Sequence, residues 1–200
     1  MIIIYQNEKE MTVSLQETLS LDTYFKLFFE NDVLIKKEEY KNHSLEYIYH
    51  YKKRDELTED IQLLYRNLNT RFSIIERSVI NTQTLELWQD FDEADLIFKY
   101  KILYNAGNNC ICKEYLDIET DKPIYEETEK YYYTESSSEL DYIIKASYNT
   151  DATLNYLVYF KSGENQPADI EYKDANELAE LSSELKIDSS ELKYYFDAYL

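Results

Sequence analysis

The chain has 200 residues, with 40 acidic against 21 basic side chains and a formal net charge of −19. Such a surface repels nucleic-acid phosphates and anionic lipids, so direct binding to nucleic acid or to a membrane is disfavoured and a basic protein partner is favoured. A composition that is 44% hydrophobic excludes a disordered acidic tail and predicts a globular protein. The alternative interpretation of the acidity is that it only keeps the protein soluble.

The N-terminal stretch MIIIYQNEKEM has an apolar run of three residues, too short for a signal peptide or a membrane anchor. With two cysteines and no export signal, we expect a cytoplasmic protein. Residues 14–30 are ambiguous, because Leu15, Leu19 and Tyr24 have helical spacing whereas TYFKLFF is typical of a strand.

Four stretches share one pattern, in which an apolar run is followed by Asn, small polar residues and a second run that ends on an aromatic side chain. The second runs span 42–51, 81–91, 105–115 and 149–160. Asn and small polar residues tolerate left-handed backbone, so each stretch predicts a β-hairpin. Alternation in the first trailing run places Leu45, Tyr47, Tyr49 and Tyr51 on one face, and in the fourth it places Leu154, Tyr156, Val158 and Phe160 on one face.

Two further stretches fit between these hairpins. Residues 115–133 would turn at Asp121 to Pro123. Residues 61–75 could turn at Asn67 to Asn69, although residues 56–68 could instead form a short helix.

The C-terminal region has a different pattern. Residues 174–186 and 188–200 each begin with Asp followed three residues later by Glu, at Asp174 and Asp188, which is a capping-box signature of a helix. We therefore predict an α+β, mostly β fold: an antiparallel β-hairpin meander over residues 1–162, a linker over 163–173, and two short helices over 174–200 packed on the sheet in the same globule.

The sequence contains no motif for catalysis or metal binding above background. Cys110 and Cys112 lie two residues apart on a predicted strand with no further cysteine, so we expect small buried side chains, with Gly107 in the preceding turn. His43 and His50 have no Ser or Cys partner in the local sequence. We therefore predict no catalytic residues, no metal, no cofactor and no enzymatic activity, and keep an enzyme with an unrecognised pocket as an alternative.

The strongest candidate surface is acidic and rich in tyrosine. It lies within residues 114–141, and tyrosine is an efficient interface residue because its ring orders at little entropic cost. Its expected partner-binding residues are Asp117, Glu119, Asp121, Glu126, Glu127, Glu129, Tyr131, Tyr133 and Glu135. The competing interpretation is a solvated sheet face whose tyrosines cover the core.

As a small, acidic, tyrosine-rich domain without a catalytic motif, the chain resembles the immunity proteins that accompany bacterial polymorphic toxins. The hairpins DVLIKKEEYKNHSLEYIYHY and DLIFKYKILYNAGNNCICKEY are also similar to tyrosine-rich hairpin repeats of bacterial surface and toxin proteins, with Asn in place of the turn glycine. The resemblance implies an inhibitor that binds a basic toxin or nuclease. The alternatives are a DNA-mimic inhibitor of a host nuclease, of the anti-restriction type, and a structural or adaptor domain; oligomeric state stays open.

Overall fold

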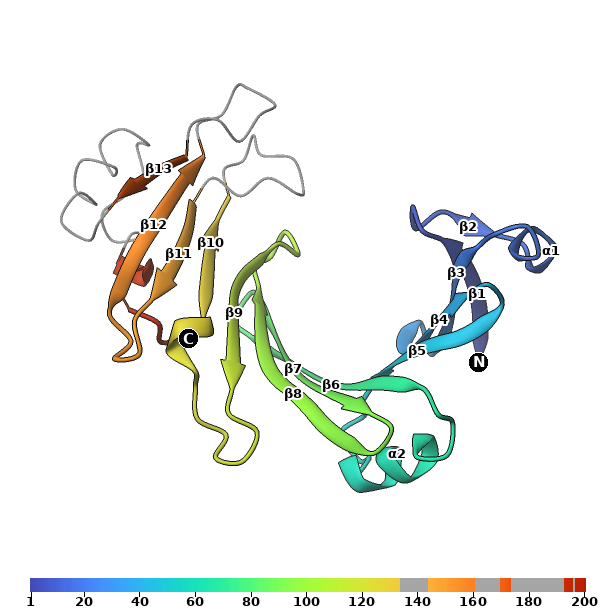
Figure 1. Ribbon diagram of the computed structural model, residues 1–200. Coiled ribbons are helices and arrows are strands. Elements are labelled where there is room, and N and C mark those ends of the chain that lie inside the picture. Colours follow the sequence, from blue (N-terminus) through green and yellow to red (C-terminus); the bar gives the residue numbers. More distant parts are fainter. Residues whose placement is uncertain (134–143, 161–169, 174–192, 196) are drawn as a thin grey trace. The chain divides into compact units, whose positions relative to one another are not determined.

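The computed structural model describes residues 1–133, 144–160, 170–173, 193–195 and 197–200, and these are mostly β-strand (Figure 1). The strands are β1 (Ile2–Asn7), β2 (Thr12–Val13), β3 (Thr23–Glu30), β4 (Val33–Lys41), β5 (Ser44–Tyr51), β6 (Arg71–Ile80), β7 (Gln83–Asp92), β8 (Asp95–Tyr104), β9 (Cys110–Leu116), β10 (Glu129–Tyr132), β11 (Ile144–Tyr148), β12 (Leu154–Phe160) and β13 (Ile170–Lys173). The described helices are α1 (Leu15–Thr18), α2 (Thr58–Tyr65) and the 3₁₀ turns η1 (Tyr125–Glu127) and η2 (Lys193–Tyr195).

The strands form one mixed sheet in the order β13-β12-β11-β10-β9-β8-β7-β6-β5-β4-β3-β1-β2, so nearly all neighbours in the sheet are also neighbours in the sequence. The predicted mostly β hairpin meander is confirmed at this level. Its purely antiparallel character is wrong at one place, because β5 and β6 pair in parallel, with Tyr47 opposite Arg71. A parallel pair needs a crossover connection, and α2 supplies it, which confirms the helical alternative for residues 56–68.

The chain divides into two compact units. Unit 1 comprises residues 1–78 and 86–99, and unit 2 comprises residues 79–85 and 100–200. Residues 170–173, which we expected in a linker, form β13 and pair with β12. Residues 163–169 and the predicted helix 174–186 lie outside the described residues.

The described part of the second predicted C-terminal helix is not an α-helix. Residues 193–195 form the turn η2, and Asp197 makes an isolated antiparallel bridge with Thr153. After the turn, the segment bonds to the connection between β11 and β12 instead of continuing a helix: the amide of Ala198 donates to the carbonyl of Ala152 at 2.9 Å.

The ambiguous N-terminal segment contains both predicted elements in succession. Ser14 caps α1 in a capping box, in which the Ser14 amide donates to the Glu17 carboxylate at 2.6 Å and the Glu17 amide donates to the Ser14 hydroxyl at 3.3 Å. The helix is only four residues long, and the chain then enters β3. The apolar, aromatic run in β3 therefore prevails over the helical spacing.

The four predicted hairpins are present, and left-handed residues make their turns. Asn42 and His43 both have positive φ (49° and 64°), as a tight two-residue turn between twisted strands requires. The turn over 105–109 uses Asn differently, because the side-chain oxygen of Asn105 accepts from the amides of Gly107 and Asn109 at 2.9 and 3.0 Å. Its left-handed residue is Asn108, not Gly107.

Two trailing strands begin with a β-bulge that the alternation pattern does not reveal. On β4, the neighbouring residues Glu39 and Tyr40 pair with Tyr47 and Leu45 of β5. Glu46 lies between these two partners and has no partner of its own, so it is the extra residue of the bulge. The bulge turns Leu45 to the face of Ile48, where it packs on the core. In β12, Leu154 pairs with Tyr148 after Tyr156 pairs with Ser147. Both leucines therefore face the core, and their predicted placement with the following tyrosine is wrong.

The core of unit 1 lies between the sheet and α2 (Figure 1). It consists of Ile48, Ile61, Tyr65, Phe72, Ile74 and Phe91. Ile61 and Tyr65 are four residues apart on the helix and so share its buried side. Phe72 and Phe91 stack on the sheet with ring centroids 4.8 Å apart.

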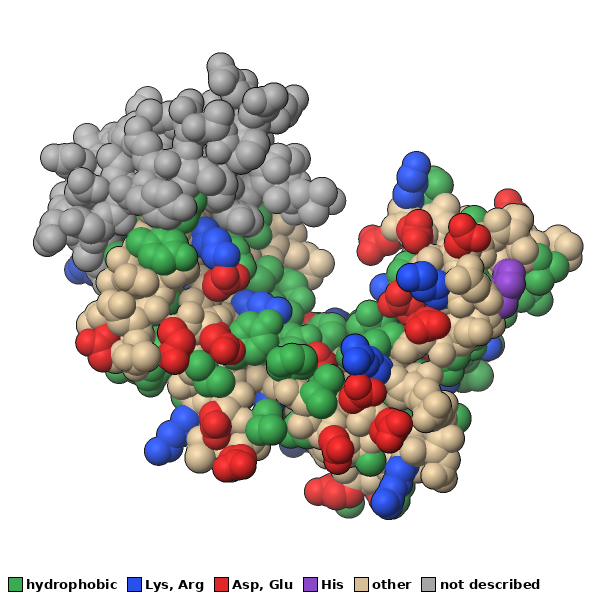
Figure 2. All heavy atoms as spheres, viewed as in Figure 1, with side chains coloured by type: hydrophobic (Ala, Val, Ile, Leu, Met, Phe, Trp, Pro, Cys, Tyr) green, Lys and Arg blue, Asp and Glu red, His purple; other side chains and the backbone are tan. Residues whose placement is uncertain are grey.

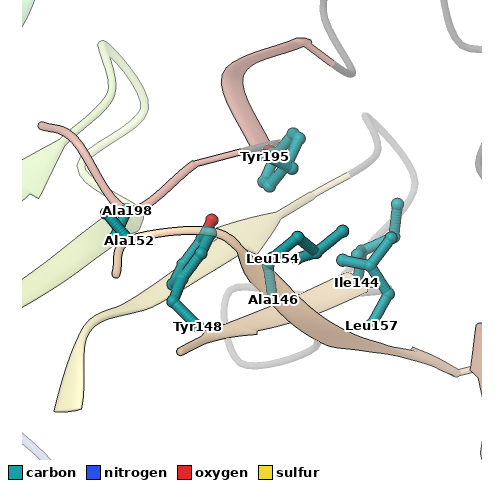
Figure 3. Close-up of a cluster of buried hydrophobic side chains, with 8 residues drawn as sticks. All are labelled: Ile144, Ala146, Tyr148, Ala152, Leu154, Leu157, Tyr195 and Ala198. Carbon is teal, nitrogen blue, oxygen red and sulfur yellow. The ribbon is translucent and has the colours of Figure 1, made fainter. Parts of the chain in front are cut away.

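The described core of unit 2 covers one face of β11 and β12 (Figure 3). It consists of Ile144, Ala146, Tyr148, Ala152, Leu154 and Leu157, with Tyr195 and Ala198 packed on them. Residues of β11 and β12 and residues near the C-terminus therefore share one cluster.

Candidate functional site

The predicted partner-binding residues that the structure describes lie in unit 2, between the end of β9 and the end of β10. Asp117, Glu119 and Asp121 belong to the connection that follows β9, and Glu126 and Glu127 to η1. Glu129 and Tyr131 lie on β10, and Tyr133 follows it. Glu135 is outside the described residues.

The connection after β9 is ordered by Asp117. Its carboxylate accepts from the hydroxyl and the amide of Thr120 at 2.6 and 2.8 Å, and these hydrogen bonds hold the pKa of Asp117 below its usual value. The Asp117 amide donates to the carbonyl of Lys122 at 2.8 Å, and Asp121 takes a left-handed backbone. The predicted turn is thus present, but it begins at Asp117, four residues before the predicted position.

Three acids of this region are exposed and unpaired. Glu119, Glu126 and Glu127 are exposed and form no ion pair with any described residue. We call these three residues the acidic connection. Among the residues that the structure describes, no cation compensates their negative charge.

Several carboxylates on the strands are paired instead. Glu114 is buried and accepts from Lys101 at 2.8 Å, and Glu86 is buried and accepts from Arg77 at 2.8 Å. Glu129 pairs with Lys145 and also accepts from the Tyr131 hydroxyl. Figure 2 shows acidic side chains scattered among lysines and apolar side chains on the viewed face, rather than in one continuous band.

The three consecutive tyrosines at 131–133 do not act as one surface. Tyr131 shares the face of Glu129, whereas the neighbouring Tyr132 points to the other face and packs against the core of unit 2. This agrees with the expectation that at most two of them share a side. Of the nine predicted residues, Glu129 and Tyr131 are thus occupied with each other and with Lys145, while the acidic connection is free.

The two cysteines lie on β9, as predicted, and both are free thiols. Burial raises the pKa of Cys110 to about 11 and that of Cys112 to about 12, so both stay protonated at neutral pH. In the described ranges, no group of three or more His, Cys, Asp or Glu side chains is arranged to hold a metal ion.

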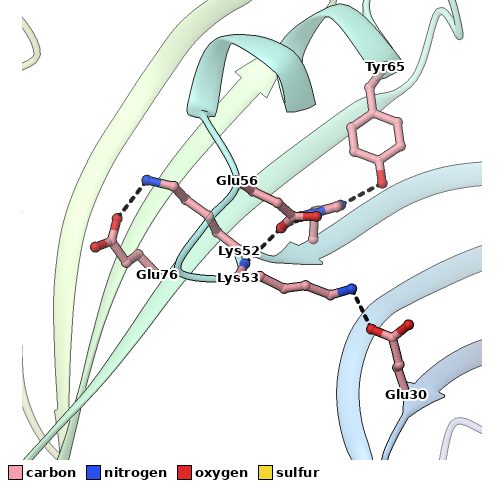
Figure 4. Close-up of polar contacts among 7 residues, drawn as sticks. Glu30, Lys52, Lys53, Glu56, Tyr65 and Glu76 are labelled. Carbon is pink, nitrogen blue, oxygen red and sulfur yellow. Dashed lines mark hydrogen bonds and ion pairs between the residues drawn. The ribbon is translucent and has the colours of Figure 1, made fainter.

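No local sequence pattern predicts the network around His50, whose contacts are drawn in Figure 4. The ring accepts or donates at both nitrogens: Nδ1 lies 2.7 Å from the Tyr65 hydroxyl and Nε2 lies 3.1 Å from the Glu56 carboxylate. A carboxylate only accepts, so Nε2 carries a proton, and in the neutral ring Nδ1 accepts from Tyr65. Burial raises the pKa of Tyr65.

The carboxylate of Glu56 also fixes the connection before α2. It accepts from the amide of Lys53 at 2.7 Å, and the ammonium of Lys53 pairs with Glu30 (Figure 4). Burial raises the pKa of Glu56, but the hydrogen bonds from Lys53 and His50 outweigh it and lower the value overall. His50 on β5 bonds both Tyr65 on α2 and Glu56 in the connection before it, so the network holds α2 on β5.

A second feature missed from the sequence is the face of unit 1 opposite α2. The buried hydroxyl of Ser73 donates to Asp90 at 2.6 Å, so the Tyr47 hydroxyl, 2.7 Å away, is the donor to Ser73. Burial raises the pKa of Tyr47 to about 12. Trp88 donates to Glu86 at 2.9 Å, and its ring lies edge-on to Tyr49 at 6.1 Å.

This face also contains its own cations. The ammonium of Lys37 lies 4.0 Å from the centroid of Phe25 and 5.5 Å from that of Tyr49, and Arg77 lies 5.1 Å from Tyr51. Rings, cations and carboxylates on neighbouring strands of this face therefore stabilise one another.

Neither helix in the part of the chain that the structure describes is long and apolar enough to cross a membrane. The chain matches no protein-family model, and comparisons with curated proteins and with solved structures likewise yield no match.

Proposed function

We propose that the chain is an acidic immunity protein that acts in the cytoplasm, where it binds a basic toxin effector and neutralises it by electrostatic docking and occlusion. It makes and breaks no covalent bond. The partner is a protein with a cationic surface, and the binding surface includes the acidic connection of unit 2.

The observation that carries this proposal is the contrast between paired and unpaired carboxylates. Glu86, Glu114 and Glu129 on the strands face lysine or arginine, whereas Glu119, Glu126 and Glu127 are exposed close together without a counter-ion among the described residues. Unpaired exposed charges add little to folding stability, but their field reaches into solvent. In a chain with net charge −19, they favour rapid encounter with a cationic protein.

The same contrast favours this function over a DNA mimic. A mimic needs carboxylates in rows at phosphate-like spacing. The carboxylates of Glu86, Glu114 and Glu129 alternate with the cations that neutralise them. Glu119, Glu126 and Glu127, which pair with no cation of the described residues, lie on one short connection, and this suits a local contact with a basic protein.

The test begins with the reading frame next to this gene. We expect its product to end in a basic domain that stops cell growth when produced alone, and we expect growth to return when this chain is produced with it. The triple variant Glu119→Gln, Glu126→Gln, Glu127→Gln should rescue growth poorly.

The matched control removes the same charge from exposed acids of unit 1, by Glu8→Gln, Glu46→Gln and Glu59→Gln. This control should rescue growth as the natural chain does. Lack of rescue by the natural chain, together with no complex in low-salt pull-down, would refute the proposal. Equal rescue by both triple variants would remove the acidic connection from it.

A further inference from the structure

Unit 2 has a peptide segment seated on its sheet. We call this segment the strap; it consists of residues 193–195 and 197–200. Tyr195 and Ala198 of the strap are buried against the cluster of β11 and β12 (Figure 3). The ring of Tyr199 lies edge-on to that of Tyr125, with centroids 5.6 Å apart.

One buried lysine holds the strap. Lys130 on β10 has no solvent exposure, and its ammonium donates to the main-chain carbonyls of Tyr194 and Tyr199, each at 2.7 Å. The same ammonium lies 3.8 Å from the centroid of the Tyr194 ring. Burial lowers the pKa of Lys130 because it disfavours the charged ammonium. The two carbonyls and the Tyr194 ring offset part of this cost of burying the charge.

The remaining polar contacts of the strap also use main-chain atoms. The amide of Ala198 donates to the carbonyl of Ala152 at 2.9 Å, and the hydroxyl of Tyr195 donates to the carbonyl of Tyr131 at 3.2 Å. The floor is formed by a cross-strand row in which Cys112 pairs with Lys130 and Ala146 with Leu157. Small residues here leave room for a chain to lie across the sheet.

The seated strap also leaves two polar groups unsatisfied. The hydroxyls of Tyr148 and of Tyr194 in the strap are buried without a hydrogen-bond partner among the described residues. A buried hydroxyl in this state opposes the seated arrangement, so the strap is bound by a few strong contacts rather than by complete complementarity.

We propose that this face of unit 2 is a receptor for the strap, and that the strap of a second copy of this chain can occupy it in place of the chain's own. Each contact described joins the strap to residues 112–157. An identical strap from another copy reproduces all of them, which is the condition for exchange between copies. The chain's own strap competes at high effective concentration, so the exchange becomes visible when that competition is removed.

The experiment uses two full-length variants with complementary defects. Ala198→Asp places a carboxylate at a buried strap position, which spoils the strap but leaves the receptor face intact. Lys130→Met spoils the receptor but leaves the strap intact. Each variant alone should keep the mass of the natural chain in sedimentation, and an equimolar mixture should form a complex with twice that mass.

The control replaces Lys130→Met by Lys145→Met. Lys145 lies on the opposite face of β11 from Ala146, so this chain keeps its own strap bound and should not join Ala198→Asp. If circular dichroism shows that Ala198→Asp or Lys130→Met is unfolded, the milder variants Tyr195→Ala in the strap and Lys130→Gln in the receptor replace them. Their equimolar mixture should likewise form a complex with twice the mass of the natural chain. A mixture of folded variants that shows no added mass would overturn the proposal.

Discussion

Phe72→Ala tests the claim that unit 1 is held together by the core under α2. Phe72 has no solvent exposure, stacks on Phe91 at 4.8 Å and contacts the ring of Tyr65 at 5.3 Å. Truncating a buried Phe costs about 3–5 kcal/mol, and a stacked aromatic pair contributes about 0.5–1.5 kcal/mol of this. We therefore expect a loss of about 4 kcal/mol in the free energy of unfolding.

Trp88 makes this measurable for unit 1 alone. It is the only tryptophan in the sequence and lies in unit 1, so its fluorescence during urea denaturation reports on that unit. The control is Leu64→Ala on the exposed side of α2, where the side chain is 63% exposed and a change within about 0.5 kcal/mol is expected. A loss below about 1 kcal/mol for Phe72→Ala, or equal losses for both variants, would refute the placement of the core.

Three further predictions concern single positions. The hydrogen bonds to Glu56 lower its pKa in the folded chain, so they stabilise the fold at pH values above its unfolded pKa near 4.5. This contribution is lost as the pH falls through the folded pKa. Glu56→Gln should therefore remove that part of the pH dependence of the free energy of unfolding in acid. His43→Gly should stabilise by about 1 kcal/mol in thermal unfolding, because glycine adopts φ of 64° without strain. Cys112 should resist thiol reagents at pH 8 in the folded chain and react after denaturation, since it is buried with a pKa of about 12.

The sequence pattern was sufficient to locate the hairpins, because their turns are short and local. Asn42, Asn81, Asn105 and Asn149 all lie at strand ends as predicted. Alternation predicted the wrong face only where a bulge inserts a residue, at Glu46 and Asn155. A bulge moves the side chains before it to the opposite face of the sheet, but the order of apolar and polar residues in the sequence does not reveal it.

The long-range contacts could not be derived from the sequence. His50 meets Tyr65 across the α2 crossover, and Lys130 meets carbonyls more than sixty positions later. Neither pairing has a local signal. Composition predicted the acidic surface, but pairing with lysine and arginine decides which carboxylates remain free. Only the structure separates Glu129, which is neutralised by Lys145, from Glu119 on the neighbouring connection.

The central claim is that unpaired carboxylates of unit 2 steer a cationic protein to this chain. The most direct measurement is the association rate with the product of the neighbouring reading frame, by stopped flow, as a function of ionic strength. We predict that the rate falls about tenfold or more from low to physiological salt, and that the Glu119, Glu126, Glu127 triple variant is slower and less salt-dependent. A rate that does not change with ionic strength, or that is the same in the triple variant, would contradict the claim.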